Sequence, residues 1–291
     1  VMLQQSIRRT YLNYYKEHTE FNMPHRICSL QEYIANAMIR DECELIYTFV
    51  IGGAKDHKAP TQMVDSVDPN RPLTLEPPSG TTGSDSPQAN AEIINDVTYL
   101  NIKENDGAGK SATFFKWANS IIRDGTISVD YIAKVEMDMM LFAPRWFEFT
   151  QSVLMPSPYN RLIYGGMLMD RLSCGGLQDW RCRQMVNKNY MSNEAYFLSP
   201  DLAEFIVSDE LDRSTLTFGA EDLAIGNYVN SCPHPIHQIV ISPRHVLWDN
   251  TRWLGEAERY EKHWEAVKDT WKNKPGTRLS ASPAANTPAR P

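Results

Sequence analysis

Two carboxylates stand two residues apart where an apolar, strand-like run ends. Glu136 and Asp138 follow the segment 131–135, and residues i and i+2 of an extended chain point to the same side. The two side chains can therefore converge on one hard cation. Proteins commonly hold Mg²⁺ or Mn²⁺ with oxygen ligands from one or two carboxylates, completed by the phosphates of a substrate. The pair predicts a divalent cation at a phosphate site, and the plainer alternative is two solvated acids in a loop.

Three other places in the chain carry residue types suited to the same chemistry. Glu221 and Asp222 open a predicted helix, where they either interact with the helix dipole or supply a general base for a hydroxyl group. His245 follows a predicted strand and is either a structural histidine or a third metal ligand. Lys110 begins a predicted helix and is either an exposed lysine or a phosphate contact. A P-loop is excluded there, because Glu104 occupies the position of its first glycine.

Strands that alternate with helices must position these residues. The predicted strands are 45–51, 97–102, 131–135, 161–164 and 237–241, and the predicted helices are 2–16, 109–123, 144–151, 200–208, 220–230 and 254–271. The segment 196–198 is expected in a loop. This alternation predicts an α/β fold with a mostly parallel sheet, in which ligands bind at the carboxyl ends of strands. The acidic pair and Gly165-Gly166 both fall at predicted strand ends.

Composition sets the outer limits of the prediction. The 291 residues suffice for one large domain, predicted over 1–273, and the Pro-, Ser- and Gly-rich stretches 54–90 and 274–291 are predicted to be a disordered insertion and a disordered tail. A formal net charge of −7 argues against a nucleic-acid partner. The five cysteines look too few and too scattered for a disulfide scaffold, with Cys174 and Cys182 either a short disulfide loop or buried thiols.

Six blocks of the chain follow one another in a specific order. They are Ile7-Arg8-Arg9-Thr10-Tyr11, Phe49-Val50-Ile51-Gly52, the stretch 92–101 with Lys110-Ser111 after it, Lys134-Val135-Glu136-Met137-Asp138, the stretch 192–202, and Glu221-Asp222-Leu223-Ala224-Ile225-Gly226. In the same order they are similar to Ile-Arg-x-Thr-Trp, Phe-Leu-Leu-Gly, Glu…Gly-Asp-Ile-Ile with Lys-Thr, Lys-Thr-Asp-Asp-Asp, Ser-Gly-Gly-Gly-Tyr-Val-Leu-Ser-x-Asp-Leu and Glu-Asp-Val-x-x-Gly. The chain thus resembles the inverting β-1,3-glycosyltransferases of the galactosyltransferase/fringe type over about 2–245, less the insertion.

This resemblance implies a GT-A type, Rossmann-like single domain with a mostly parallel central sheet flanked by helices. It implies a UDP-sugar donor carrying galactose or N-acetylglucosamine, a glycan acceptor, a β-1,3 linkage, and Mn²⁺ or Mg²⁺. It also implies a type II membrane protein of the Golgi lumen, with the membrane segment upstream of this chain. The implied roles are a catalytic base at Asp222, metal ligands at Glu136, Asp138 and His245, donor contacts at Arg8 and Lys110, and a sugar-binding loop at Gly165, Gly166, Glu194 and Glu221.

Two departures from the family pattern keep other functions open. Met137 replaces the middle acid of the metal-binding run, and Asn193-Glu194 replace two glycines beside the sugar. One alternative is therefore a glycan-binding protein with a glycosyltransferase fold and no catalytic activity. The other is a different nucleotide-dependent transferase that uses the same acidic pair, such as a nucleotidyltransferase.

Overall fold

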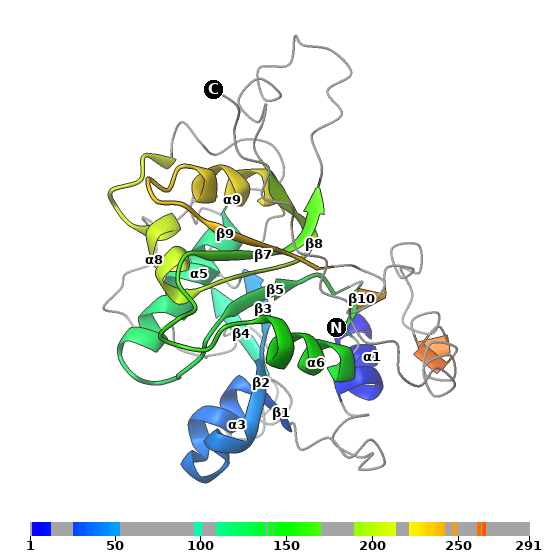
Figure 1. Ribbon diagram of the computed structural model, residues 1–291. Helices are drawn as coiled ribbons and strands as arrows, with labels where there is room; N and C mark the ends of the chain where they lie inside the picture. Colours follow the sequence, from blue (N-terminus) through cyan, green and yellow to red (C-terminus); the bar gives the residue numbers. More distant parts are fainter. Residues whose placement is uncertain are drawn as a thin grey trace.

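The computed structural model describes residues 2–12, 26–52, 96–100, 109–137, 139–141, 143–169, 189–213, 221–241, 247–248, 261–262 and 264–265 (Figure 1). The predicted insertion, the predicted tail, most of the predicted helix 254–271, and the residues Asp138, Cys174, Cys182 and His245 lie outside these ranges. Within the described ranges, none of the helices has the length and apolar character needed to cross a membrane.

The largest sheet has four strands in the order β5–β8–β7–β9. They are β5 (Ile132–Val135), β7 (Ile163–Met169), β8 (Tyr190–Leu198) and β9 (His237–Val240). Strand β8 runs antiparallel to both of its neighbours, and β7 pairs in parallel with β9. The prediction of a mostly parallel central sheet is therefore wrong for this sheet. The cause is β8, which the sequence pattern places in a loop: its residues are buried on both faces, so it lacks the polar alternation of a half-exposed strand.

Three two-stranded sheets complete the strand pairing of the described residues. Strand β1 (Arg26–Ser29) pairs in parallel with β2 (Cys43–Tyr47), β3 (Phe49–Gly52) pairs in parallel with β4 (Val97–Leu100), and β6 (Met140–Leu141) is antiparallel to β10 (Leu247–Trp248). The predicted strand 45–51 is thus two strands, separated by Thr48. The Thr48 hydroxyl lies 3.1 Å from the carbonyl oxygen of Asp96 and 2.7 Å from the Thr98 hydroxyl. The fold is mixed α/β with several small sheets.

Among the described residues, four helices agree closely with the predicted ranges 109–123, 144–151, 200–208 and 220–230. The predicted helix 2–16 is an α-helix only over Met2–Ile7, and the helix Leu30–Ala35 was not predicted. The described helices are α1 (Met2–Ile7), α3 (Leu30–Ala35), α5 (Lys110–Arg123), α6 (Ala143–Val153), α8 (Pro200–Val207) and α9 (Glu221–Asn230), with a π-helix at Arg8–Leu12 and a 3₁₀-helix at Ala37–Glu42. Local signals account for their starts. Ser29 and Glu32 form a capping box at α3, and Pro200 takes the first position of α8, where a missing backbone N–H is harmless.

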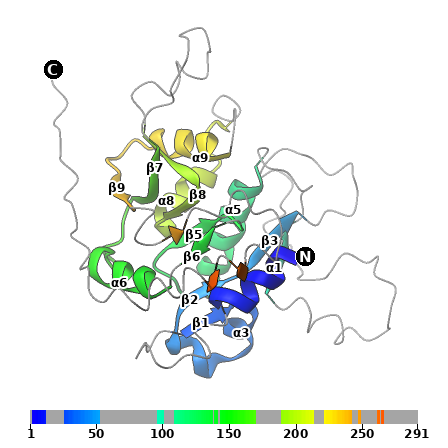
Figure 2. The same ribbon diagram turned by 90° about the vertical axis from the view of Figure 1, so that its right-hand side faces the viewer.

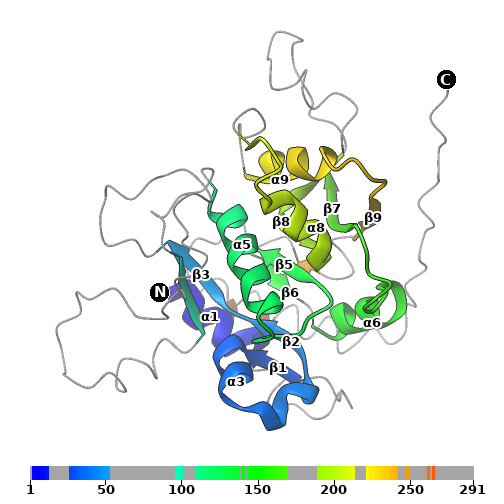
Figure 3. The same cartoon turned by 90° about the vertical axis from the view of Figure 1, so that its left-hand side faces the viewer.

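Two hydrophobic layers hold the four-stranded sheet between helices. On one face, Phe197 of β8 packs against Trp146 and Phe149 of α6. On the other face, Tyr196 and Leu198 of β8 belong to a second core with α5, α8 and α9, which Figure 3 shows on the same side of the sheet. Figure 2 shows β1, β2 and α3 grouped far from α9. Strand β8 therefore lies between both cores, and its neighbours fix it firmly.

Candidate active site

The candidate site lies beside an irregular stretch of β8, here called the bulge, where the register with β7 shifts. Gly166 of β7 pairs with Tyr196 of β8, and Leu168 of β7 pairs with Met191 of β8, so β8 has more residues between the two pairs than β7 has. The extra β8 residues leave the ladder with β7. The Glu136 backbone N–H donates to the Glu194 carbonyl oxygen at 3.0 Å. The bulge therefore lies against the end of β5, where the acidic pair begins.

Lys134 is the residue that joins the elements of this site. Its ammonium donates to Glu136 Oε1, to the Asn193 carbonyl oxygen at 2.8 Å and to Glu221 Oε2 at 2.9 Å. Its side chain is only 17% exposed. Burial alone would lower the pKa of Lys134, but the charges of Glu221 and Glu136 outweigh burial and raise that pKa above its ordinary value. Lys134 is therefore a cation at neutral pH that links β5, β8 and α9.

Glu221 is held from two sides. Its Oε2 accepts from Lys134, and its Oε1 accepts a hydrogen bond from the Tyr196 hydroxyl. Burial, and then the negative charge of Glu221, raise the pKa of Tyr196 well above its ordinary value, so the phenol keeps the proton that it donates. The Ser111 side chain also hydrogen-bonds Tyr196. Since Lys110 precedes Ser111 in the first turn of α5, this helix start belongs to the same cluster.

Asp222 is a buried carboxylate of the site, 9% exposed, at the second position of α9. Its Oδ2 accepts the Asn193 backbone N–H at 3.3 Å, and its Oδ1 accepts the Leu223 N–H at 2.9 Å. Burial raises the pKa of Asp222, and the charge of Glu221 adds to that rise, while the backbone hydrogen bonds oppose it. A carboxylate with a raised pKa is a stronger base than a solvated one. Asp222 is therefore suited to accept a proton.

Close packing positions α9 against β8. A Cβ atom on Gly226 would overlap the Cβ of Tyr190, so only glycine allows this approach of the helix to the strand. The approach brings Tyr190 near Asp222, whose charge adds to burial in raising the pKa of Tyr190. Close packing against Tyr190 therefore explains why glycine occupies position 226, the last residue of the block 221–226.

Glu136 is the one predicted metal ligand that the structure describes. Its side chain is 39% exposed at the end of β5, and its Oε1 accepts from Lys134. Asp138 and His245 lie outside the described residues. Among the residues that are described, no group of three or more His, Cys, Asp or Glu side chains could hold a metal ion. A half-exposed carboxylate here suits a cation, and the metal site as a whole stays a prediction.

Arg8, predicted to contact a donor, makes contacts within the protein. Its Nε and Nη2 each donate to one oxygen of Asp96 at 2.6 Å, and its guanidinium lies 4.9 Å from the centroid of the Phe49 ring. Asp96 is 8% exposed and directly precedes β4. These contacts tie the N-terminal helix to β3 and β4, so the position has a structural role whether or not a donor binds there.

Gly165 and Gly166 lie inside β7, and their prediction at a strand end is wrong. A Cβ atom on Gly165 would overlap the Phe197 ring. One on Gly166 would lie 2.7 Å from the Ala195 carbonyl oxygen. Close packing against β8 therefore explains both glycines. The predicted sugar-loop residue Glu194 lies nearby in the bulge, with its side chain buried.

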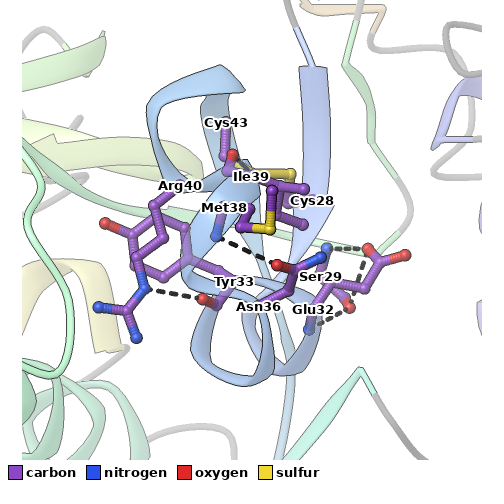
Figure 4. Close-up of a disulfide and its surroundings, with 9 residues drawn as sticks. All are labelled: Cys28, Ser29, Glu32, Tyr33, Asn36, Met38, Ile39, Arg40 and Cys43. Carbon is purple, nitrogen blue, oxygen red and sulfur yellow. Dashed lines mark hydrogen bonds between the residues drawn. A yellow bond between two sulfur atoms is a disulfide. The ribbon is translucent and has the colours of Figure 1, made fainter.

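A disulfide between Cys28 and Cys43 was not expected from the sequence (Figure 4). It joins the parallel strands β1 and β2, with a Cα–Cα distance of 5.7 Å, across the helical segment between them. The number and spacing of the cysteines argued only against a disulfide scaffold and did not predict this pair. Sequence spacing could not find it, because only the pairing of β1 with β2 brings the two residues together.

Comparison with other proteins adds no family assignment. The chain matches no protein-family model, and a search of curated proteins found no significant match. The class of protein must therefore be argued from the residues of the site.

Proposed function

We propose that the protein is a metal-dependent, inverting glycosyltransferase that moves galactose or N-acetylglucosamine from a UDP-sugar to a glycan hydroxyl, with a β-1,3 linkage. One observation carries this proposal. The buried Asp222 at the start of α9 and the half-exposed Glu136 at the end of β5 are tied into one cluster through Lys134 and its partners Glu221 and Asn193. Two carboxylates in such different environments suit two different tasks.

In this proposal Asp222 is the general base. It takes the proton of the acceptor hydroxyl, whose oxygen then attacks the anomeric carbon from the face opposite UDP. The bond between that carbon and the diphosphate oxygen breaks, and its electron pair leaves with UDP. The rise in the pKa of Asp222 through burial supports this role.

The donor diphosphate would lie on the side of Glu136. Glu136, Asp138 and His245 would hold Mn²⁺ or Mg²⁺, and such a cation neutralises negative charge on a departing diphosphate. Lys110 would contact a phosphate from the first turn of α5, where the backbone N–H groups also favour an anion. The proposed domain is of the GT-A type, with a mixed rather than a mostly parallel sheet.

The proposed location is the Golgi lumen, as a type II membrane protein. The Cys28–Cys43 disulfide supports it, because such bonds persist mainly in oxidising compartments.

A second candidate is a glycan-binding protein that has kept the fold and lost catalysis. Two observations favour it: the ammonium of Lys134 already interacts with Glu136 Oε1, and the 44% exposed side chain of Met137 follows directly. A methionine adds no charge to a site for a hard cation.

One experiment separates these functions. UDP release is measured with Mn²⁺, a panel of UDP-sugars and a panel of glycan acceptors, for the wild type and for Glu136→Ala and Asp222→Asn. A glycosyltransferase releases UDP above both variants, and Asp222→Asn keeps the thermal stabilisation by UDP and Mn²⁺ that Glu136→Ala loses. Stabilisation by UDP-sugars without release indicates the binding protein. Diphosphate release from nucleoside triphosphates indicates a nucleotidyltransferase. If the protein shows no thermal stabilisation by UDP-sugars and releases no UDP, the proposal is refuted.

A further inference from the structure

Lys134 reaches Asp222 by two separate routes without touching it. The first runs along α9: the ammonium donates to Glu221, the residue next to Asp222, at 2.9 Å. The second runs through the bulge of β8: the ammonium donates to the Asn193 carbonyl oxygen at 2.8 Å, and the Asn193 N–H donates to Asp222 Oδ2 at 3.3 Å. One side chain thus fixes the residue before Asp222 and a backbone donor to its carboxylate.

The hydrogen bonds of Lys134 and Glu221 leave little freedom in this arrangement. An ammonium has three protons, and Lys134 has three acceptors, namely Glu136, Asn193 and Glu221. Both oxygens of Glu221 are engaged, since Tyr196 donates to Oε1. The Lys134 ammonium also lies 5.7 Å from the centroid of the Tyr196 ring. A network in which each partner is satisfied holds one geometry.

We propose that Lys134 is the positioning residue of the site, which sets the Asp222 carboxylate through Glu221 and Asn193 and holds it in register with Glu136. Its effect on catalysis rests on the function proposed above. Its effect on Asp222 itself does not, because the contacts that join Lys134 to Asp222 are all made by residues of this chain. A small displacement of a reacting group is enough to slow a reaction about 100-fold.

The charges around Asp222 give a second readout. The charged groups that act on it are Glu221 on its own helix and Lys134 on β5. The phenols of Tyr190 on β8 and Tyr164 on β7 also face it, and its charge adds to burial in raising their pKa values. Of these, only Lys134 carries positive charge, and it lowers the pKa of Asp222. Loss of this charge should move the titration of Asp222 to higher pH.

The test compares Lys134→Met with Lys134→Met/Glu221→Gln, and uses Lys262→Met on an exposed helical position as the matched control. Lys134→Met leaves Glu221 buried without its cation and is expected to be less stable, whereas the double variant removes both charges. Circular dichroism confirms folding. Both variants should lose about 100-fold in kcat with the donor KM changed by no more than about threefold. The control should match the wild type.

The pH dependence of kcat distinguishes a positioning role of Lys134 from a purely structural one. In Lys134→Met the acid limb of kcat should move to higher pH. In the double variant it should move less, because Glu221 raises the pKa of Asp222 and its charge is gone as well. A folded variant with wild-type kcat and an unmoved acid limb overturns the inference.

If the wild type transfers no sugar, the proposed function is refuted, but the role of Lys134 can still be tested. In that case Asp222 is titrated by NMR on protein with ¹³C-labelled aspartate, with Asp222→Asn to assign the signal. An upward shift of its pKa in Lys134→Met supports the coupling. An unchanged titration rejects it.

Discussion

Reduction of the Cys28–Cys43 disulfide should lower the free energy of unfolding by a predictable amount. The bond closes a loop between residues separated by 15 positions in the chain. In the chain-entropy treatment, closing a loop of this length removes about 10 cal/mol/K of entropy from the unfolded chain, or about 3 kcal/mol at 25 °C. The folded segment has its own contacts, such as the Ser29–Glu32 capping box, so reduction should leave its structure in place while the unfolded state gains freedom.

The assay is urea denaturation at 25 °C, followed by tryptophan fluorescence with and without dithiothreitol. The control is Cys28→Ala/Cys43→Ala, which should start less stable and show no further loss on reduction. This control also reports any reducible bond elsewhere, including Cys174 and Cys182 outside the described residues. If reduction changes the wild-type stability by less than about 0.5 kcal/mol, the loop-closure reasoning fails for this bond.

Three further predictions concern the site and its frame. Asp222→Asn should abolish transfer yet raise the free energy of unfolding at pH 7, because the raised pKa of Asp222 means that its ionised form costs stability. This gain in stability should vanish below about pH 3.9, where the wild-type side chain is protonated in both the folded and the unfolded state. Gly165→Ala should destabilise by about 1–3 kcal/mol in urea, and Phe197→Leu in the same chain should recover part of the loss. Arg8→Ala should lower stability by about 3–5 kcal/mol by leaving a buried Asp96 unpaired, and a donor KM within threefold of the wild type would contradict the predicted donor contact.

Much of the helical structure could be predicted because helix signals are local. The start of α8 is marked by Pro200 after Ser199, and the apolar periodicity of α5 carries through to Arg123. Sheet pairing depends on residues far apart in the chain, and no local signal reports it. Strand β8 shows the difference, since both of its faces are buried and its two antiparallel neighbours come from separate parts of the chain.

The site could be predicted in part for the same reason. The pattern of acids predicted Glu136 and Asp222 as site residues, and the structure places both in one cluster around Lys134. The sequence pattern gave Lys134 no role of its own. Its role depends on contacts with Asn193 and Glu221, which lie 59 and 87 positions away in the chain. Arg8 shows the converse. Its type suits an anionic ligand, yet in the structure the anion that it binds is Asp96.

The signs of the expected stability changes separate the two kinds of charge in this cluster. Lys134 and Glu221 satisfy each other, so removal of Lys134 alone should destabilise the protein. Asp222 accepts two backbone N–H groups but has a raised pKa, so its ionised form is held in a place that burial disfavours. A purely structural carboxylate would be expected to show the opposite, a lowered pKa and a loss of stability on neutralisation. Folding disfavours the ionised form of Asp222, yet the hydrogen-bond network around Lys134 holds this carboxylate in place. Such an arrangement is expected of a catalytic base.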